Sequence, residues 1–215
     1  MEVKDVVSVT LSTISMVLSV TALYLSQFRP SNVTVSTGPM IHLFYIVPSQ
    51  PTVFLPVVFH NSSPTKAIIY KVFLEIEDTN GNHFALKWIG SVKIDLKNNY
   101  ADTEVAGPFK IDGYETIPNA LRFFWFNAEG GPQLDWLEGD YGLKLHVWTS
   151  DSVSPDYSTT DKLHIDADVA KIMADKKVTS DNTSRYLPLA GKNLLSFATG
   201  KNPVDFRNLP PGTPH

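Results

Sequence analysis

The chain has 215 residues, of which 43% are hydrophobic and 19% are charged, so it can bury the core of one ordinary domain. The formal net charge of −4 argues against a nucleic-acid partner, because nucleic acid requires a basic surface. The absence of cysteine excludes disulfides, thiolate nucleophiles, iron–sulfur clusters and cysteine-based zinc sites.

The first element is an uncharged segment at residues 6–28, VVSVTLSTISMVLSVTALYLSQF. As a helix it would be about 34 Å long, which is enough to cross a hydrocarbon layer of about 30 Å. A cleaved signal peptide is the alternative, but its positively charged start and small-residue cleavage site are missing. We therefore predict a retained transmembrane anchor over residues 1–29, embedded in membrane lipid and ending where Pro30 disfavours helical backbone at Arg29.

Small residues recur along this segment at alternating intervals of four and three. They are Ser8, Ser12, Ser15, Ser19, Ala22 and Ser26. Such a heptad-like seam lets another helix approach closely, and serine can hydrogen-bond across the contact in lipid. Alternatively, the hydroxyls are tolerated because they bond back to their own helix. We favour a packing seam, used either for self-association or for docking onto helices of other membrane protein subunits.

A linker at 30–35 leads into short β-rich runs that continue to residue 168, separated by clusters of Pro, Gly, Asn and Ser. Many short strands without a helical period predict an antiparallel sandwich or barrel. In the first hairpin, a three-residue loop at 79–81 would pair apolar residues with apolar residues across the two strands. Gly81 would then take the left-handed position that such loops need.

A second hairpin is expected between 141–149 and 160–167. The favoured register places apolar residues opposite one another on one face and matched polar or aromatic residues on the other. Its expected pairs are Leu145 with Ile165, Val147 with Leu163, Lys144 with Asp166, His146 with His164, and Trp148 with Lys162.

The stretch Leu137-Glu138-Gly139-Asp140-Tyr141 precedes the alternating residues of this hairpin. It resembles the tyrosine corner of immunoglobulin-like sandwiches, in which a Tyr hydroxyl binds backbone upstream. The resemblance covers residues 36–168 at the level of architecture and implies a membrane-anchored, immunoglobulin-like antiparallel β-sandwich with Tyr141 as a structural corner. The chain departs from the immunoglobulin pattern in having no cysteine pair.

The alternation stops after Asp168. Residues Val169 to Lys176 are compatible with two helical turns, and the following residues are polar and rich in proline. Sequences of this kind seldom form a core of their own. We therefore expect residues 169–215 to be a short helix and an extended C-terminal arm.

Few residues suggest chemistry. His146 and His164 could share a metal ion, but two ligands are fewer than a site normally needs, and a solvent-facing cross-strand pair is the favoured interpretation. Trp125, Trp136 and Trp148 could line a ligand or glycan surface, although strand aromatics more often pack in cores. Nucleophile motifs and phosphate-binding glycine loops are missing. We therefore expect neither an enzyme nor a cofactor.

The function expected from the sequence is that of a non-catalytic, single-pass accessory or scaffold subunit. It would stabilise a larger membrane complex, such as a respiratory, photosynthetic, transport or secretion complex, through its helix, head and C-terminal arm. The alternative is a membrane-anchored ligand- or glycan-binding module. Lys4 and Arg29 flank the two ends of the span almost equally, and the immunoglobulin-like head slightly favours an extracytoplasmic location.

Overall fold

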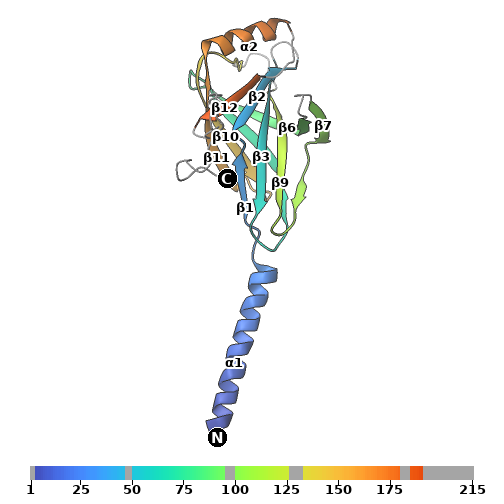
Figure 1. The fold of residues 1–215 in the computed structure, drawn as a ribbon, viewed down its shortest axis with the longest axis vertical. Coiled ribbons are helices and arrows are strands. Elements are labelled where there is room, and N and C mark those ends of the chain that lie inside the picture. Colours follow the sequence, from blue (N-terminus) through green and yellow to red (C-terminus); the bar gives the residue numbers. More distant parts are fainter. Residues whose placement is uncertain (1–2, 47–49, 95–99, 126–132, 180–184, 191–215) are drawn as a thin grey trace, which may run out of the picture.

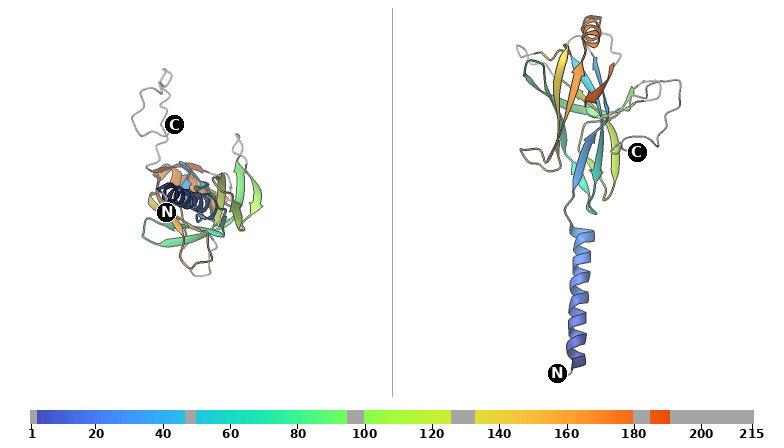
Figure 2. Two further views of the ribbon diagram at one scale, coloured as in Figure 1. Left: turned by 90° about the horizontal axis from the view of Figure 1, so that it is seen from below. Right: turned by 60° about the vertical axis from the view of Figure 1, so that its left-hand side comes forward.

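The computed structural model describes residues 3–46, 50–94, 100–125, 133–179 and 185–190. A long N-terminal helix, α1 (Val3–Leu23), projects from one end of a β-rich head, and a second helix, α2 (Ala167–Thr179), lies at the opposite end (Figure 1). The side view shows the same separation, with α1 entirely on one side of the strands (Figure 2). The molecule is therefore a head carried on a helical stalk.

The stalk is continuous, because α1 runs directly into a π-helical segment, η1 (Tyr24–Phe28). Arg29, with φ −60° and ψ 129°, is already extended, as expected for a residue before proline. The predicted end of the helix is thus confirmed. The segment Val6–Phe28, 23 residues, is long and apolar enough to cross a membrane.

The head is mainly antiparallel β, as predicted. Its strands among the described residues are β1 (Val33–Thr37), β2 (Met40–Tyr45), β3 (Pro51–Asn61), β4 (Ala67–Ile69), β5 (Lys71–Glu77), β6 (His83–Ile94), β7 (Tyr100–Val105), β8 (Phe109–Ile111), β9 (Thr116–Phe124), β10 (Gly139–Trp148), β11 (Tyr157–Ile165) and β12 (Arg185–Ala190).

Eight of these strands form a closed ring in the order β3, β2, β12, β11, β10, β5, β6 and β9. The ring closes because β9 pairs with β3 along one edge and with β6 along the other. An immunoglobulin-like sandwich of two sheets is therefore not the arrangement seen. Alternating patterns do not separate a sandwich from a barrel, since both place every second residue inside. Strands β1 and β7 pair with β3 and β6 outside the ring, and β4 and β8 form a separate small sheet.

The first hairpin has the predicted register, with Leu74 opposite Leu86 and Ile76 opposite Phe84. Gly81 has φ +79°, the left-handed conformation that a three-residue loop requires. The short loop and the apolar pattern together determine this pairing.

The second hairpin has a different register from the one predicted. Leu145 faces Thr159 instead of Ile165, and His146 faces Ser158 instead of His164. The reason lies in the connecting loop, where the Asp156 carboxylate accepts hydrogen bonds from the backbone N–H groups of Thr149 and Ser150 at 2.7 and 3.1 Å. β11 can therefore begin at Tyr157, three residues before the predicted start. The division between inner and outer faces is unchanged.

The head extends beyond its predicted boundaries at both ends. β1 starts at Val33, inside the predicted linker, and β12 inserts between β11 and β2. The predicted helix is present as α2, whose first turn is capped by the Asp166 carboxylate, 2.7 Å from the Val169 backbone N. The predicted C-terminal arm therefore contributes a strand to the barrel, and its part from residue 191 onward lies outside the described residues.

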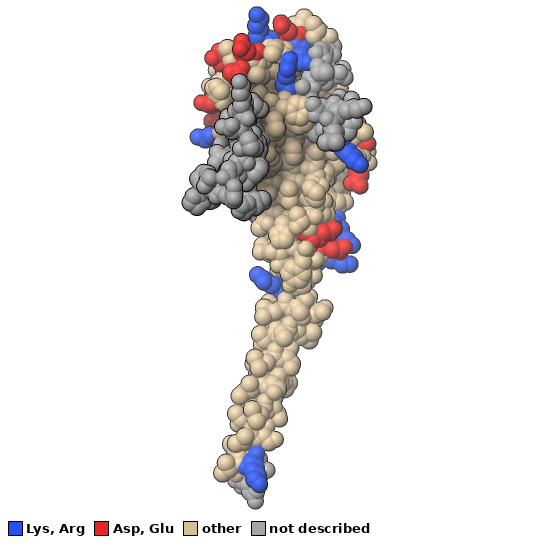
Figure 3. Space-filling model, viewed as in Figure 1, with Lys and Arg blue, Asp and Glu red and all other residues tan. Residues whose placement is uncertain are grey.

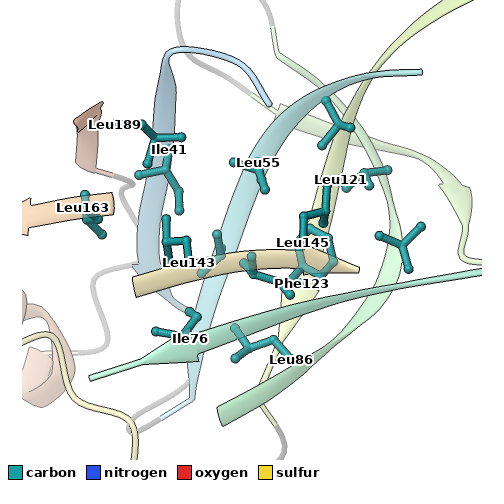
Figure 4. Packing of buried hydrophobic residues seen from close by; sticks show 14 of the residues in the cluster. Ile41, Leu55, Ile76, Leu86, Leu121, Phe123, Leu143, Leu145, Leu163 and Leu189 are labelled. Carbon is teal, nitrogen blue, oxygen red and sulfur yellow. The ribbon is translucent and has the colours of Figure 1, made fainter. Parts of the chain in front are cut away.

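The core fills the barrel interior with side chains from alternating positions of the strands that form the ring (Figure 4). Ile41, Leu55 and Leu163 come from three different strands and are fully buried. Burying a side chain of this size contributes about 1.5–3 kcal/mol. The closed ring thereby shares a single core, which also holds Leu189 of β12.

Candidate functional site

The surface of α1 is available for contact, because no part of the segment Val6–Phe28 is buried within the chain. With about 100° between successive residues of an α-helix, the predicted seam from Ser8 to Ala22 occupies an arc of about 80° on one side of the helix. Ser26 lies in η1, whose wider turn displaces it around the axis relative to the other five. The small residues thus form a stripe along most of the helix.

Several hydroxyls of α1 bond to their own backbone. Thr10 donates to the Val6 carbonyl at 2.8 Å and Thr13 to the Val9 carbonyl at 2.9 Å, while Ser19 of the seam donates to the Ser15 carbonyl at 2.8 Å. Ser26 donates to the Leu23 carbonyl at 3.2 Å. Such bonds would satisfy these hydroxyls in an apolar environment, so a partner helix would gain from the small size of Ser19 rather than from a hydrogen bond to it.

The junction between α1 and the head is held by hydrogen bonds. The Thr65 hydroxyl donates to the Arg29 carbonyl at 2.6 Å. The Ser62 backbone N–H donates to the Asn32 carbonyl at 2.9 Å, and the Asn32 side-chain amide donates to the Ser62 hydroxyl at 2.9 Å. The chain between the helix and the barrel is short, and its residues Arg29 and Asn32 are both hydrogen-bonded to the head. These bonds restrict the movement of the head relative to α1.

A polar cluster lies on the outer face of four neighbouring strands. Its centre is the Glu75 carboxylate of β5, whose two oxygens lie 2.8 Å from His83 Nδ1 and 2.8 Å from His146 Nε2. The other ring nitrogen of His146, Nδ1, lies 2.9 Å from the Ser158 hydroxyl. The hydrogen bond with His146 lowers the pKa of the Glu75 carboxyl below its ordinary value. The carboxylate is therefore ionised and shared between two imidazoles.

Glu75, His146 and Ser158 form a carboxylate–histidine–serine chain of the kind that activates a nucleophile in enzymes. The position of the nearby hollow nevertheless favours a structural role. The nearby hollow, of about 200 Å³, is lined by Glu75, Glu77 and His83 over Gly142, and Ser158 is not among its lining residues. A substrate in this hollow would therefore meet the carboxylate and not the hydroxyl. The cluster is best described as a cross-strand ladder. Its Glu75–His83 contact follows from the first hairpin register, but its His146–Ser158 contact could not be found from the wrong second one.

The two histidines considered for a metal ion do not meet. His164 Nδ1 pairs with the Asp140 carboxylate at 2.8 Å, whereas His146 belongs to the Glu75 cluster. Among the residues that the structure describes, no group of three metal-ligating side chains has the arrangement of a metal site. The predicted His146–His164 pairing is thus wrong because it depended on the incorrect hairpin register.

The three tryptophans do not form an exposed platform. Trp136 and Trp148 are 2% and 8% exposed, respectively, and Trp125 packs on the core with its ring edge-on to Phe84, at a centroid distance of 5.3 Å. Lys71 Nζ lies 4.5 Å above the Trp148 ring, instead of the Lys162 contact expected from the sequence. A flat glycan-binding surface requires accessible ring faces, so these tryptophans are packing residues.

Tyr141 has the contacts of a structural corner. Its hydroxyl accepts a hydrogen bond from the Leu137 backbone N–H at 2.7 Å and lies 3.0 Å from the carbonyls of both Asp135 and Leu137. Burial raises the pKa of Tyr141 to about 12, so the hydroxyl remains protonated and can donate. The side chain therefore fastens the start of β10 to the preceding segment.

A mainly apolar hollow of about 410 Å³ lies between α2 and the segment before β10. Tyr45, Trp136 and Val178 contribute to its walls, and Lys177 beside it forms a 2.6 Å ion pair with Asp135. No local sequence pattern indicates this hollow, because its walls come from three separate parts of the chain.

Comparison with known proteins adds no identity: no family model matches the chain, and no curated protein or solved structure shows significant similarity to it.

Proposed function

We propose that this protein is a single-pass membrane protein that acts by contact, as a non-catalytic accessory or scaffold subunit of a larger membrane assembly. The observation that supports the proposal most strongly is the exposed apolar stalk with its stripe of small residues. Membrane helices associate through such residues because small side chains permit close backbone approach. The respiratory, photosynthetic, transport and secretion complexes considered above are the assemblies that this role would fit.

The head would serve this assembly as a rigid docking body. Its barrel leaves only short strand edges open, and the short, hydrogen-bonded junction would keep it at a set position above the span.

The proposal is tested by replacing the hydroxyls of the stripe with leucine. The test variant carries Ser8→Leu, Ser12→Leu, Ser15→Leu and Ser19→Leu. Its matched control carries Thr10→Leu, Thr13→Leu and Thr21→Leu, which make the same kind of change on the opposite side of the helix. We expect the native protein and the control to migrate in mild detergent as part of a large complex, and the test variant to migrate as a monomer.

Two results would contradict this function. One is migration of the native protein as a lone monomer after mild solubilisation and chemical cross-linking. The other is retention of the complex by the stripe variant, which would show that the small residues make no contact.

A further inference from the structure

Two turns at the α1 end of the barrel pack closely against each other. They comprise residues 62–66, which follow β3, and residues 112–115, which precede β9. A Cβ on Gly113 would lie only 2.1 Å from the Pro64 carbonyl oxygen, so only glycine permits this contact. The Tyr114 backbone N–H donates to the Ser63 carbonyl at 3.0 Å. We call this pair of turns the foot.

The foot lies at the level where the span ends. Thr65 bonds to the carbonyl of Arg29 at 2.6 Å, and Arg29 directly follows Phe28, the last residue of the apolar segment. The headgroup layer extends about 6 Å beyond the hydrocarbon on each side of a bilayer. A group hydrogen-bonded at Arg29 is therefore within reach of the headgroups whenever α1 spans the membrane.

Tyr114 occupies an unusual position in the foot. Its side chain is 66% exposed, and its φ of +59° is a genuine outlier for a bulky residue. Within the described residues it is the one non-glycine with positive φ. An exposed aromatic ring held in a strained turn has no role in the core, which points to a contact outside the chain.

The charges around Tyr114 are the two ammonium groups of Lys66 and Lys110 and the two carboxylates of Asp112 and Glu115. Lys66 and Lys110 are well exposed, and both approach the Asp112 carboxylate, at 3.8 and 3.0 Å. Figure 3 shows both basic and acidic side chains at the end of the head that adjoins the stalk. Tyrosine and lysine are the residue types that anchor proteins at the bilayer interface, with the ring at the headgroup level and the ammonium group toward phosphate.

We propose that the foot, together with the neighbouring Lys110 of β8, is a lipid-contact surface: Tyr114 enters the headgroup layer of the bilayer that α1 spans, and Lys66 and Lys110 contact lipid phosphates. The inference rests on the proposed single-pass anchoring and adds a second membrane contact to it. The barrel then stands upright on the bilayer, with α2 at its far end from the lipid.

The experiment uses the full chain in phospholipid vesicles that contain a headgroup-spin-labelled lipid. Because the chain has no cysteine, a single introduced cysteine can carry a fluorophore at one chosen position. The test positions are 114 and 66. The Tyr114→Cys variant places the fluorophore at the proposed contact but removes the ring, whereas the Lys66→Cys variant keeps Tyr114 in place. Phe28→Cys reports on the anchor, and Val178→Cys, on exposed α2, is the distal control.

We expect strong quenching at position 28, at least half as much at positions 114 and 66, and none at position 178. Adding Tyr114→Ser to the Lys66→Cys protein should at least halve the quenching at position 66. Quenching at 28 without quenching at 114 and 66 would overturn the foot while leaving the anchor intact. An unquenched position 28 would overturn the anchor and the foot together, and unchanged quenching at 66 after Tyr114→Ser would remove the role assigned to Tyr114.

Discussion

At the scale of single residues, two polar side chains determine how β10 begins and ends. Asp156 shortens the β10–β11 loop by accepting backbone hydrogen bonds, and Tyr141 secures the entry to β10. The Asp156 contact was not predictable, because an Asp in a Ser-rich stretch looks like any loop residue. The contact of Tyr141 lies within a few residues along the chain, which is why its motif is visible in the sequence.

Replacing Tyr141 with phenylalanine should destabilise the head. The substitution removes the hydroxyl that accepts a hydrogen bond from the Leu137 backbone N–H at 2.7 Å and lies 3.0 Å from the carbonyls of Asp135 and Leu137, and each lost hydrogen bond costs about 0.5–1.5 kcal/mol. The free energy of unfolding from urea titration is the measurement. Tyr70→Phe, at an exposed side chain, is the control and should have little effect. Equal stability of Tyr141→Phe and the native protein would show that the corner contributes nothing.

His42 should make the head less stable in mild acid. It is 5% exposed and stacks near Tyr186, with ring centroids 3.8 Å apart. Desolvation by burial lowers its pKa from 6.5 to about 4. The unfolded chain therefore takes up a proton below pH 6.5 that the folded protein takes up only near pH 4, so stability falls as the pH falls through this window.

The matching variant is His42→Phe, which has no group to protonate. Between pH 7 and pH 5, the native protein should lose about 2 kcal/mol more unfolding free energy than His42→Phe. The difference between the two proteins removes the contributions of all other titrating groups. Parallel pH profiles for the two proteins would show that His42 is not desolvated.

At the scale of elements, strand pairings between residues close in the sequence were predictable, and pairings between distant residues were not. The 79–81 loop is short and has a glycine where positive φ is needed, so the β5–β6 register was predictable. The β10–β11 loop is long, and several registers keep the same faces inside. Strand β12 was missed because its apolar pattern covers only Leu187 and Leu189, and its partners β2 and β11 are far away in sequence.

The contribution of β12 to the stability of the barrel can be tested with one pair of substitutions. Leu189 is 1% exposed and belongs to the core, whereas its neighbour Ala190 is exposed. Leu189→Asp should destabilise the barrel by about 3 kcal/mol or more, because it buries an unpaired charge. Ala190→Asp should have almost no effect. Thermal unfolding followed by circular dichroism measures both, and equal melting temperatures would mean that β12 does not close the barrel.

At the scale of the whole molecule, the long apolar helix and the β-rich class were predictable, because a long uncharged run and repeated short strands are strong signals. The closure of the sheet was not, since the pairing of β9 with both β3 and β6 depends on contacts that no local pattern encodes. The hydrogen bonds from the 62–65 turn to the end of the stalk were equally hidden. These hydrogen bonds connect the head to the end of the helix, between which the sequence predicts only a linker at residues 30–35.

The retained, membrane-spanning anchor is the central claim, and cysteine accessibility in sealed vesicles tests it most directly. Lys4→Cys lies before the apolar segment and Tyr70→Cys lies in the head; each would be the only cysteine in its chain. With a membrane-impermeant maleimide, we predict that one of the two positions reacts in intact vesicles and the other only after lysis. Reaction of both positions from the same side, or loss of residue 4 from the mature chain, would contradict the anchor.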